Sequence, residues 1–157
     1  MGTCLRGGEN ATRPHIDFIT LAVGDLERSL EFYRDGLALP TRGVVGTEFH
    51  DAVTGADGTI AFVEFQNGLV VGLYERANLA KDAAIDEVPA SSLEFSLGHI
   101  VGSRGEVDDI LTRAERAGAA VMRPPHERPW GVYSGHFKDP DGHLWEVVWN
   151  PRAAVGE

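Results

Sequence analysis

The 157-residue sequence has a single cysteine and no apolar run close to the roughly 20 residues that a membrane-spanning helix needs. Cys4 therefore has no partner for a disulfide within the chain, which is typical of a protein from a reducing compartment. Residues 1–14 are polar and lack the apolar core of a signal peptide. We expect residues 1–14 to form a flexible leader, and we expect a cytoplasmic protein.

Positive charge is also scarce, because 24 Asp and Glu against 14 Lys and Arg give a formal net charge of -10. Proteins that bind nucleic acid normally carry a basic face, and an anionic membrane repels an acidic protein. The acidic residues are scattered along the chain, as in proteins whose charge serves solubility. The composition argues against nucleic acid and membrane as partners and favours a small-molecule ligand, with a cationic one left open.

The first half of the chain predicts the order strand, helix, strand, strand, strand. Residues 16–23 are apolar and rich in β-branched side chains, and Asp25 follows at the N-cap position of a helix whose apolar residues recur up to Leu37. We expect Gly36 to end that helix. The dipeptide Asn67-Gly68 is typical of a two-residue hairpin loop. The later strands of this half are expected at 42–50, 59–66 and 69–74.

The second half predicts the same order again. The stretch Ser103-Arg104-Gly105-Glu106 is a capping box, in which the serine oxygen accepts a bond from a free helix N–H and the glutamate reaches back. Gly118 ends the helix, and the turn Asp139-Pro140-Asp141-Gly142 joins the last two strands. The two helix caps are separated along the sequence by nearly the same number of residues as the two hairpin glycines. Such a constant offset is a signature of an internal repeat. The expected segments are a first module at 15–75, a linker at 76–92, a second module at 93–151 and a tail at 152–157.

Two parts of the sequence resemble a known family. Residues 18–29 (FITLAVGDLERS) and 32–37 (FYRDGL) are similar to the opening of a vicinal oxygen chelate module. Trp130-Gly131 and residues 137–146 (FKDPDGHLWE) resemble its closing hairpin. This superfamily includes glyoxalases, bleomycin-resistance proteins and extradiol dioxygenases. The resemblance implies an α+β fold of paired βαβββ modules that form a curved, cup-shaped mixed sheet with helices on the outer face. It also implies a homodimer.

The resemblance further implies four positions at which the metal-dependent members hold a divalent ion. These positions fall on Phe18, Gly72, Ser96 and Glu146. Phenylalanine and glycine have no side chain that can bind a metal, and serine is a poor ligand. Since a catalytic metal needs about three protein ligands, we expect no metal cofactor at this site. Glu146 is the one retained ligand position, and a metal held by other residues stays open.

The candidate catalytic residues are Glu146 and His136. Alternation along residues 143–149 places Glu146 on the face opposite its tryptophan neighbours, where it could act as a base or bind a cation. His136 lies on the adjacent strand and could supply a second polar group. The alternative for Glu146 is that it pairs with an arginine or a backbone donor inside the cup. His99 shares a face with Leu97 and Val101 and is predicted to be a core histidine.

Candidate ligand-binding residues are mostly aromatic side chains on or near the predicted strands. They are Phe18, Phe62, Ser96, Trp130 and Tyr133. Core packing is the alternative for each aromatic residue. Three functions remain open: a metal-free small-molecule-binding protein, a divergent lyase or dioxygenase-type enzyme that uses Glu146 as base or metal ligand, and a non-catalytic structural or partner-binding module.

Overall fold

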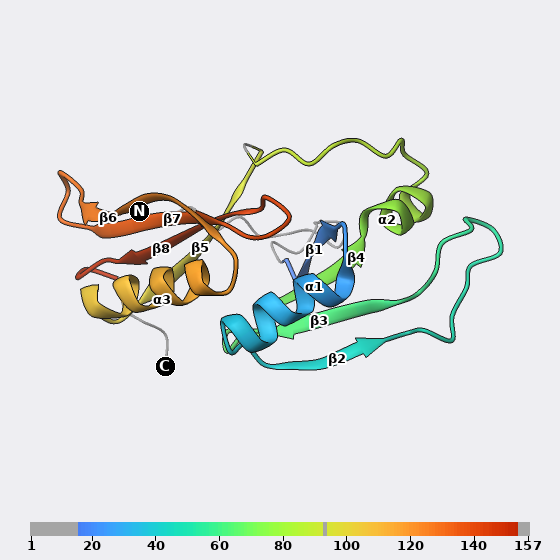
Figure 1. The fold of residues 1–157 in the computed structure, drawn as a ribbon, viewed down its shortest axis with the longest axis horizontal. Helices are drawn as coiled ribbons and strands as arrows, with labels where there is room; N and C mark the ends of the chain where they lie inside the picture. The colour runs from blue at the N-terminus through green and yellow to red at the C-terminus, as the bar shows by residue number, and fades with distance from the viewer. Residues whose placement is uncertain (1–15, 93, 154–157) are drawn as a thin grey trace, which may run out of the picture.

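The computed structural model describes residues 16–92 and 94–153, so the expected leader at 1–14 lies outside the described residues. It contains two four-stranded mixed sheets, each accompanied by helices (Figure 1). The α+β class with paired modules, expected from the sequence, is thereby confirmed. No helix of the described residues is long and apolar enough to cross a membrane.

The first module forms a sheet in the order β1-β4-β3-β2, with β1 and β4 parallel and the other neighbours antiparallel. Its elements are β1 (Phe18–Val23), α1 (Leu26–Glu31), η1 (Phe32–Gly36), β2 (Thr41–Val45), β3 (Ile60–Glu64) and β4 (Val70–Glu75). The side chain of Asp25 caps α1 by accepting a bond from the Arg28 N–H at 3.1 Å. The helix widens into the π-helical turn η1 over its last residues, which end at Gly36.

The second module has the same topology, in the order β5-β8-β7-β6. Its elements are β5 (Ser96–Val101), α3 (Arg104–Arg116), β6 (Ala120–Glu127), β7 (Tyr133–Lys138) and β8 (Leu144–Trp149). The serine half of the predicted capping box is present, since Ser103 Oγ accepts from the Glu106 N–H at 3.1 Å. The Glu106 carboxylate reaches one residue beyond the N-cap and accepts from the Gly102 N–H at 2.9 Å.

The expected linker at 76–92 begins with a helix, α2 (Arg76–Ala83), whose apolar residues show little helical periodicity. One local expectation needs correction. The loop between β3 and β4 is longer than two residues, because Phe65 and Leu69 form its closing backbone bond at 3.0 Å. Gly68 takes the left-handed position of this loop, with φ +86.

One hydrophobic core runs through both modules. At the seam, the rings of Tyr33 and Trp145 lie 5.9 Å apart, and those of Phe32 and Phe137 lie 6.2 Å apart. These contacts join the end of the first-module helix to strands β7 and β8. The helix-bearing faces of the two sheets therefore pack against a shared core, and each sheet keeps its other face free of that core.

Candidate functional site

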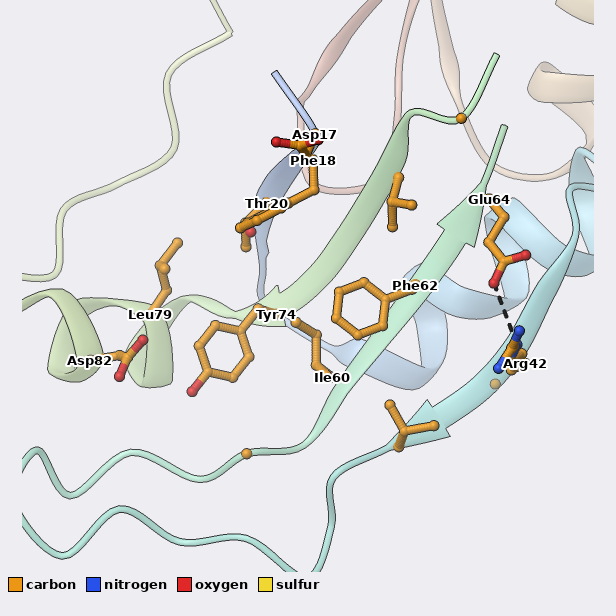
Figure 2. A pocket seen from close by; sticks show the side chains of 15 residues that line it. Asp17, Phe18, Thr20, Arg42, Ile60, Phe62, Glu64, Tyr74, Leu79 and Asp82 are labelled. Carbon is orange, nitrogen blue, oxygen red and sulfur yellow. Dashed lines mark ion pairs between the residues drawn. The ribbon is translucent and has the colours of Figure 1, made fainter. Parts of the chain in front are cut away.

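The first sheet is hollowed on the face that points away from α1. This first-sheet hollow has a volume of about 900 Å³. Figure 2 shows Phe18, Thr20, Phe62 and Tyr74 around the same space. The other apolar side chains that line it are Val45, Ile60, Val70 and Leu79. All the lining residues that belong to the described part of the chain come from the first module and α2.

Strand alternation explains why these side chains reach the hollow. In β1, Leu21 and Val23 are buried on the helix side, so Phe18 and Thr20 point the other way, and Phe18 is 63% exposed. In β3, Ala61 and Val63 are buried, and Phe62 alternates with them. The same rule applied to β4 would have found Tyr74, which the sequence analysis missed.

Carboxylates surround the apolar wall of the hollow. Asp17, Glu64 and Asp82 line it, and one guanidinium, that of Arg42, lies 3.4 Å from the Glu64 carboxylate. The Tyr74 hydroxyl donates to the Asp57 carbonyl at 2.6 Å. Burial raises the pKa of Tyr74, and the negative charge of Asp82 raises it further. This part of the hollow therefore favours a cation over an anion.

The second sheet carries Glu146 and His136 on the equivalent face. They are directly opposite each other in the antiparallel pair β7–β8, so their side chains are neighbours. On the other side, Glu146 is paired with Gly98, where an added Cβ would meet nothing within 4 Å. Within residues 16–92 and 94–153, neither side chain has a hydrogen bond or an ion pair, so the expected arginine partner of Glu146 is not found there.

The predicted ligand-binding residues do not all meet. Phe18 and Phe62 lie in the first-sheet hollow, whereas Ser96 belongs to the same face of the second sheet as Glu146. Trp130 precedes β7 and is 60% exposed. Tyr133 does not face the cup as expected. It shares the helix-bearing face with Phe137, and its hydroxyl donates to Asp108 of α3 at 2.7 Å.

The positions at which the resemblance implies metal ligands do not fit a divalent ion. Phe18 and Gly72 lie on the first sheet, and Ser96 and Glu146 on the second. Across the part of the chain that the structure describes, no three His, Cys, Asp or Glu side chains are grouped as metal ligands would be. One carboxylate is too small a donor set for zinc or iron.

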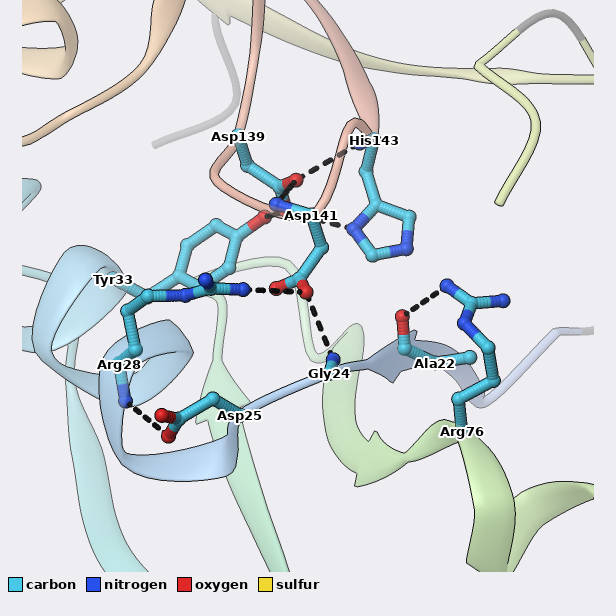
Figure 3. Close-up of polar contacts among 9 residues, drawn as sticks. All are labelled: Ala22, Gly24, Asp25, Arg28, Tyr33, Arg76, Asp139, Asp141 and His143. Atoms are coloured by element: carbon cyan, nitrogen blue, oxygen red, sulfur yellow. Dashed lines mark hydrogen bonds and ion pairs between the residues drawn. The ribbon is translucent and has the colours of Figure 1, made fainter. Parts of the chain in front are cut away.

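The turn between β7 and β8 packs against the first module at Gly24, Arg28 and Tyr33 (Figure 3). Asp141 Oδ1 accepts from the Gly24 N–H at 2.8 Å and from Arg28 Nη2 at 3.1 Å. Asp139 Oδ2 accepts from the Tyr33 hydroxyl at 2.5 Å. The Asp-Pro-Asp-Gly motif thus has a structural task, which is to hold the hairpin that bears Glu146 against α1.

The Asp139 carboxylate is buried and fully bonded. His143 lies beside it, with Nδ1 2.7 Å from Asp139 Oδ2, and the His143 N–H donates to Oδ1 at 2.8 Å. Burial raises the pKa of Tyr33 well above its usual value, and the adjacent Asp139 charge raises it further. The Tyr33 phenol therefore stays a hydrogen-bond donor at neutral pH.

Comparison with known proteins extends over both modules. The Glyoxalase/Bleomycin resistance protein/Dioxygenase superfamily matches residues 15–147. A "Probable lactoylglutathione lyase" of Vibrio cholerae is 28% identical over 145 residues, which covers 87% of this chain and 91% of the relative. The crystal structure of a glyoxalase-related enzyme from Fulvimarina pelagi has a TM-score of 0.74 and 31% identity, and covers 92% of this chain and 94% of that one. A lactoylglutathione lyase from Agrobacterium tumefaciens shares the fold, with a TM-score of 0.62, 21% identity, and coverage of 92% and 100%.

Proposed function

Because this chain belongs to the glyoxalase/bleomycin resistance protein/dioxygenase superfamily, we propose that it binds a small molecule without the help of a divalent metal. One observation carries the proposal. The first-sheet hollow has an aromatic and apolar wall, and Phe18 and Gly72 occupy the two family ligand positions of the first sheet. Phe18 supplies ring surface at a position where the metal-dependent members hold a ligand. This surface suits an organic molecule better than an ion.

The ligand class follows from the wall and the charges. Phe18, Phe62 and Tyr74 offer faces on which an aromatic ring can stack. Three carboxylates and one guanidinium line the same hollow, and a cation held over an aromatic ring gains further. We therefore take a small aromatic cation as the preferred ligand.

A homodimer would complete the site. The free faces of both sheets expose apolar side chains, among them Phe18, Phe62, Ile100 and Met122, and such surface marks an interaction site. The hollow of one chain draws no residue from its own second module. We propose that the Glu146 face of a second copy covers the hollow, as the homodimers of this superfamily suggest. Size-exclusion chromatography with light scattering tests the dimer directly.

The binding test uses a matched pair of probes, naphthylmethylammonium and naphthoate, which share a ring and differ in charge. We expect the cation to bind more tightly, and we expect Phe62→Ala to weaken its binding. Phe49→Ala is the control, since Phe49 is 65% exposed and does not line the hollow. Equal affinity of both probes, or equal loss in both variants, would overturn the proposed ligand class.

A second candidate is a metal-independent lyase with Glu146 as base. The observation that favours it is the direct cross-strand pairing of Glu146 with His136. The names of two relatives suggest lactoylglutathione as the compound to assay. Turnover that survives a chelator and disappears in Glu146→Gln would support the enzyme. If neither probe binding nor turnover is found, a partner-binding role is left. The single cysteine supports a cytoplasmic location in each case.

A further inference from the structure

A second cavity lies at the seam between the modules, on the opposite side of the second sheet from Glu146. This seam cavity has a volume of about 220 Å³. Its apolar wall is formed by Leu37, Leu39 and Phe65 of the first module and by Ile110, Phe137 and Trp145 of the second. Strand alternation separates it from the candidate site, because Val147 and His99 line the cavity while their neighbours Glu146 and Gly98 face the other way.

Two polar side chains, His99 and Arg113, interrupt the apolar wall. His99 is half-buried on β5, and burial lowers the pKa of its imidazole, so the ring is neutral at pH 7. Arg113 projects from the exposed side of α3. Among the residues that the structure describes, neither the His99 ring nor the Arg113 guanidinium has a hydrogen bond or ion pair. Both groups are therefore available to a ligand.

We propose that the seam cavity is a second binding site, specific for a small aromatic monocarboxylate. The ring would occupy the apolar wall, and the carboxylate would accept hydrogen bonds from the Arg113 guanidinium, whose fork matches two carboxylate oxygens. The size agrees, since an apolar protein cavity of about 150 Å³ is known to hold benzene. The only formal charge in the lining at pH 7 is that of Arg113, so an anion is preferred over a cation.

The seam cavity is proposed to bind an anion, whereas the first-sheet hollow is proposed to bind a cation. The seam proposal does not depend on the proposal for the hollow. Its ligand would contact both modules at once. A ligand that binds only the packed arrangement stabilises the folded state. Trp145 and Val147, which line the cavity, are also the chain neighbours of Glu146. A ligand in the seam cavity therefore contacts strand β8 directly beside Glu146.

The test uses benzoate, with benzylamine and benzyl alcohol as cationic and neutral comparisons. We expect benzoate to raise the Tm and to shift the backbone amide resonances of Ile110 and Val147, while the two comparisons bind at least about tenfold more weakly, as the loss of a hydrogen bond to a charged group predicts. Arg113→Gln should weaken benzoate by about tenfold or more for the same reason. Arg116→Gln is the matched control, because Arg116 is exposed on the same helix and does not line the cavity.

Three results would overturn the seam site. The first is that benzoate shifts the amide resonances of Phe62 and Tyr74 in the first-sheet hollow and leaves those of Ile110 and Val147 unchanged. The second is that benzylamine binds as tightly as benzoate, and the third is that the Arg113→Gln and Arg116→Gln variants bind benzoate with equal affinity. Because Arg113 is exposed, its substitution is expected to leave the fold intact, and the comparison remains decisive.

Discussion

The Tyr33 hydroxyl donates a hydrogen bond to Asp139 Oδ2 at 2.5 Å across 106 residues of sequence. The Tyr33 hydroxyl oxygen in turn accepts a hydrogen bond from Trp145 Nε1 at 3.1 Å. One phenol therefore links the first-module helix, the turn between β7 and β8, and strand β8. It does so inside the shared core, where a polar group without partners is costly. The two modules are thus joined by polar bonds as well as by apolar packing.

Tyr33→Phe should lower the free energy of unfolding by about 1–3 kcal/mol, because it leaves the buried Asp139 carboxylate short of a donor. Tyr133→Phe is the control, since its hydroxyl bonds to Asp108 at an exposed site and its loss should cost about 0–1 kcal/mol. Urea denaturation of both variants gives the comparison. A loss in Tyr33→Phe no larger than in Tyr133→Phe would show that the buried bond contributes little.

Gly36 and Ala117 lie so close together at the seam that a second substitution should restore the stability lost by the first. A Cβ on Gly36 would overlap with the Ala117 Cβ at the end of α3. Gly36→Ala should therefore cost about 1–3 kcal/mol of stability, and Ala117→Gly in the same chain should recover much of it. Gly105→Ala is the control, because its nearest atom is Ser103 Oγ at 3.8 Å. Thermal unfolding of the single and double variants measures the coupling, and additive losses would argue against this contact.

The half-buried imidazole of His99 predicts a loss of stability in acid. Burial lowers its pKa below the usual value of about 6.5. The unfolded chain therefore takes up the proton first, and the free energy of unfolding falls as the pH drops below about 6.5. Urea denaturation at pH 7.5 and 5.5 should show a smaller pH effect in His99→Leu than in the wild type. The same pH dependence in both proteins would exclude His99 as a source.

Glu146→Gln should weaken the binding of naphthylmethylammonium by about tenfold, because in the proposed dimer the Glu146 carboxylate of the second copy faces the hollow. It should leave stability nearly unchanged, because the half-buried side chain has no ion pair among the described residues. Glu115→Gln, an exposed change of the same charge on α3, controls for the net charge. Calorimetric titration measures both. Unchanged affinity and unchanged turnover in Glu146→Gln would remove this residue from the site.

Protein purified without added metal should contain far less than one transition-metal ion per chain. The reason is the donor set, in which Phe18 and Gly72 replace side chains that could bind a metal. Elemental analysis by mass spectrometry is the measurement. A chelator should leave the affinity for naphthylmethylammonium unchanged. A stoichiometric metal ion would contradict the proposal and would require ligands outside the four family positions.

Local rules predicted much of the fold. Asp25 and Ser103 cap their helices because each side chain satisfies a helix N–H that has no other partner. The placement of His99 on the helix-bearing face followed from alternation with Leu97 and Val101. Tyr133 was expected in the cup, although its alternation with Phe137 along β7 places it on the helix-bearing face. Helix α2 was missed because its residues carry little apolar periodicity.

The sequence by itself determined the repeated strand and helix order, the family resemblance and the face of Glu146, because each depends on neighbours along the chain. Only the tertiary structure decided that the hollow of the first sheet stands apart from Glu146 in one chain. It also decided that the Asp139 turn serves the module seam, and that a cavity with Arg113 lies there. These features arise where residues from different modules pack together, and short-range patterns carry no information about such contacts.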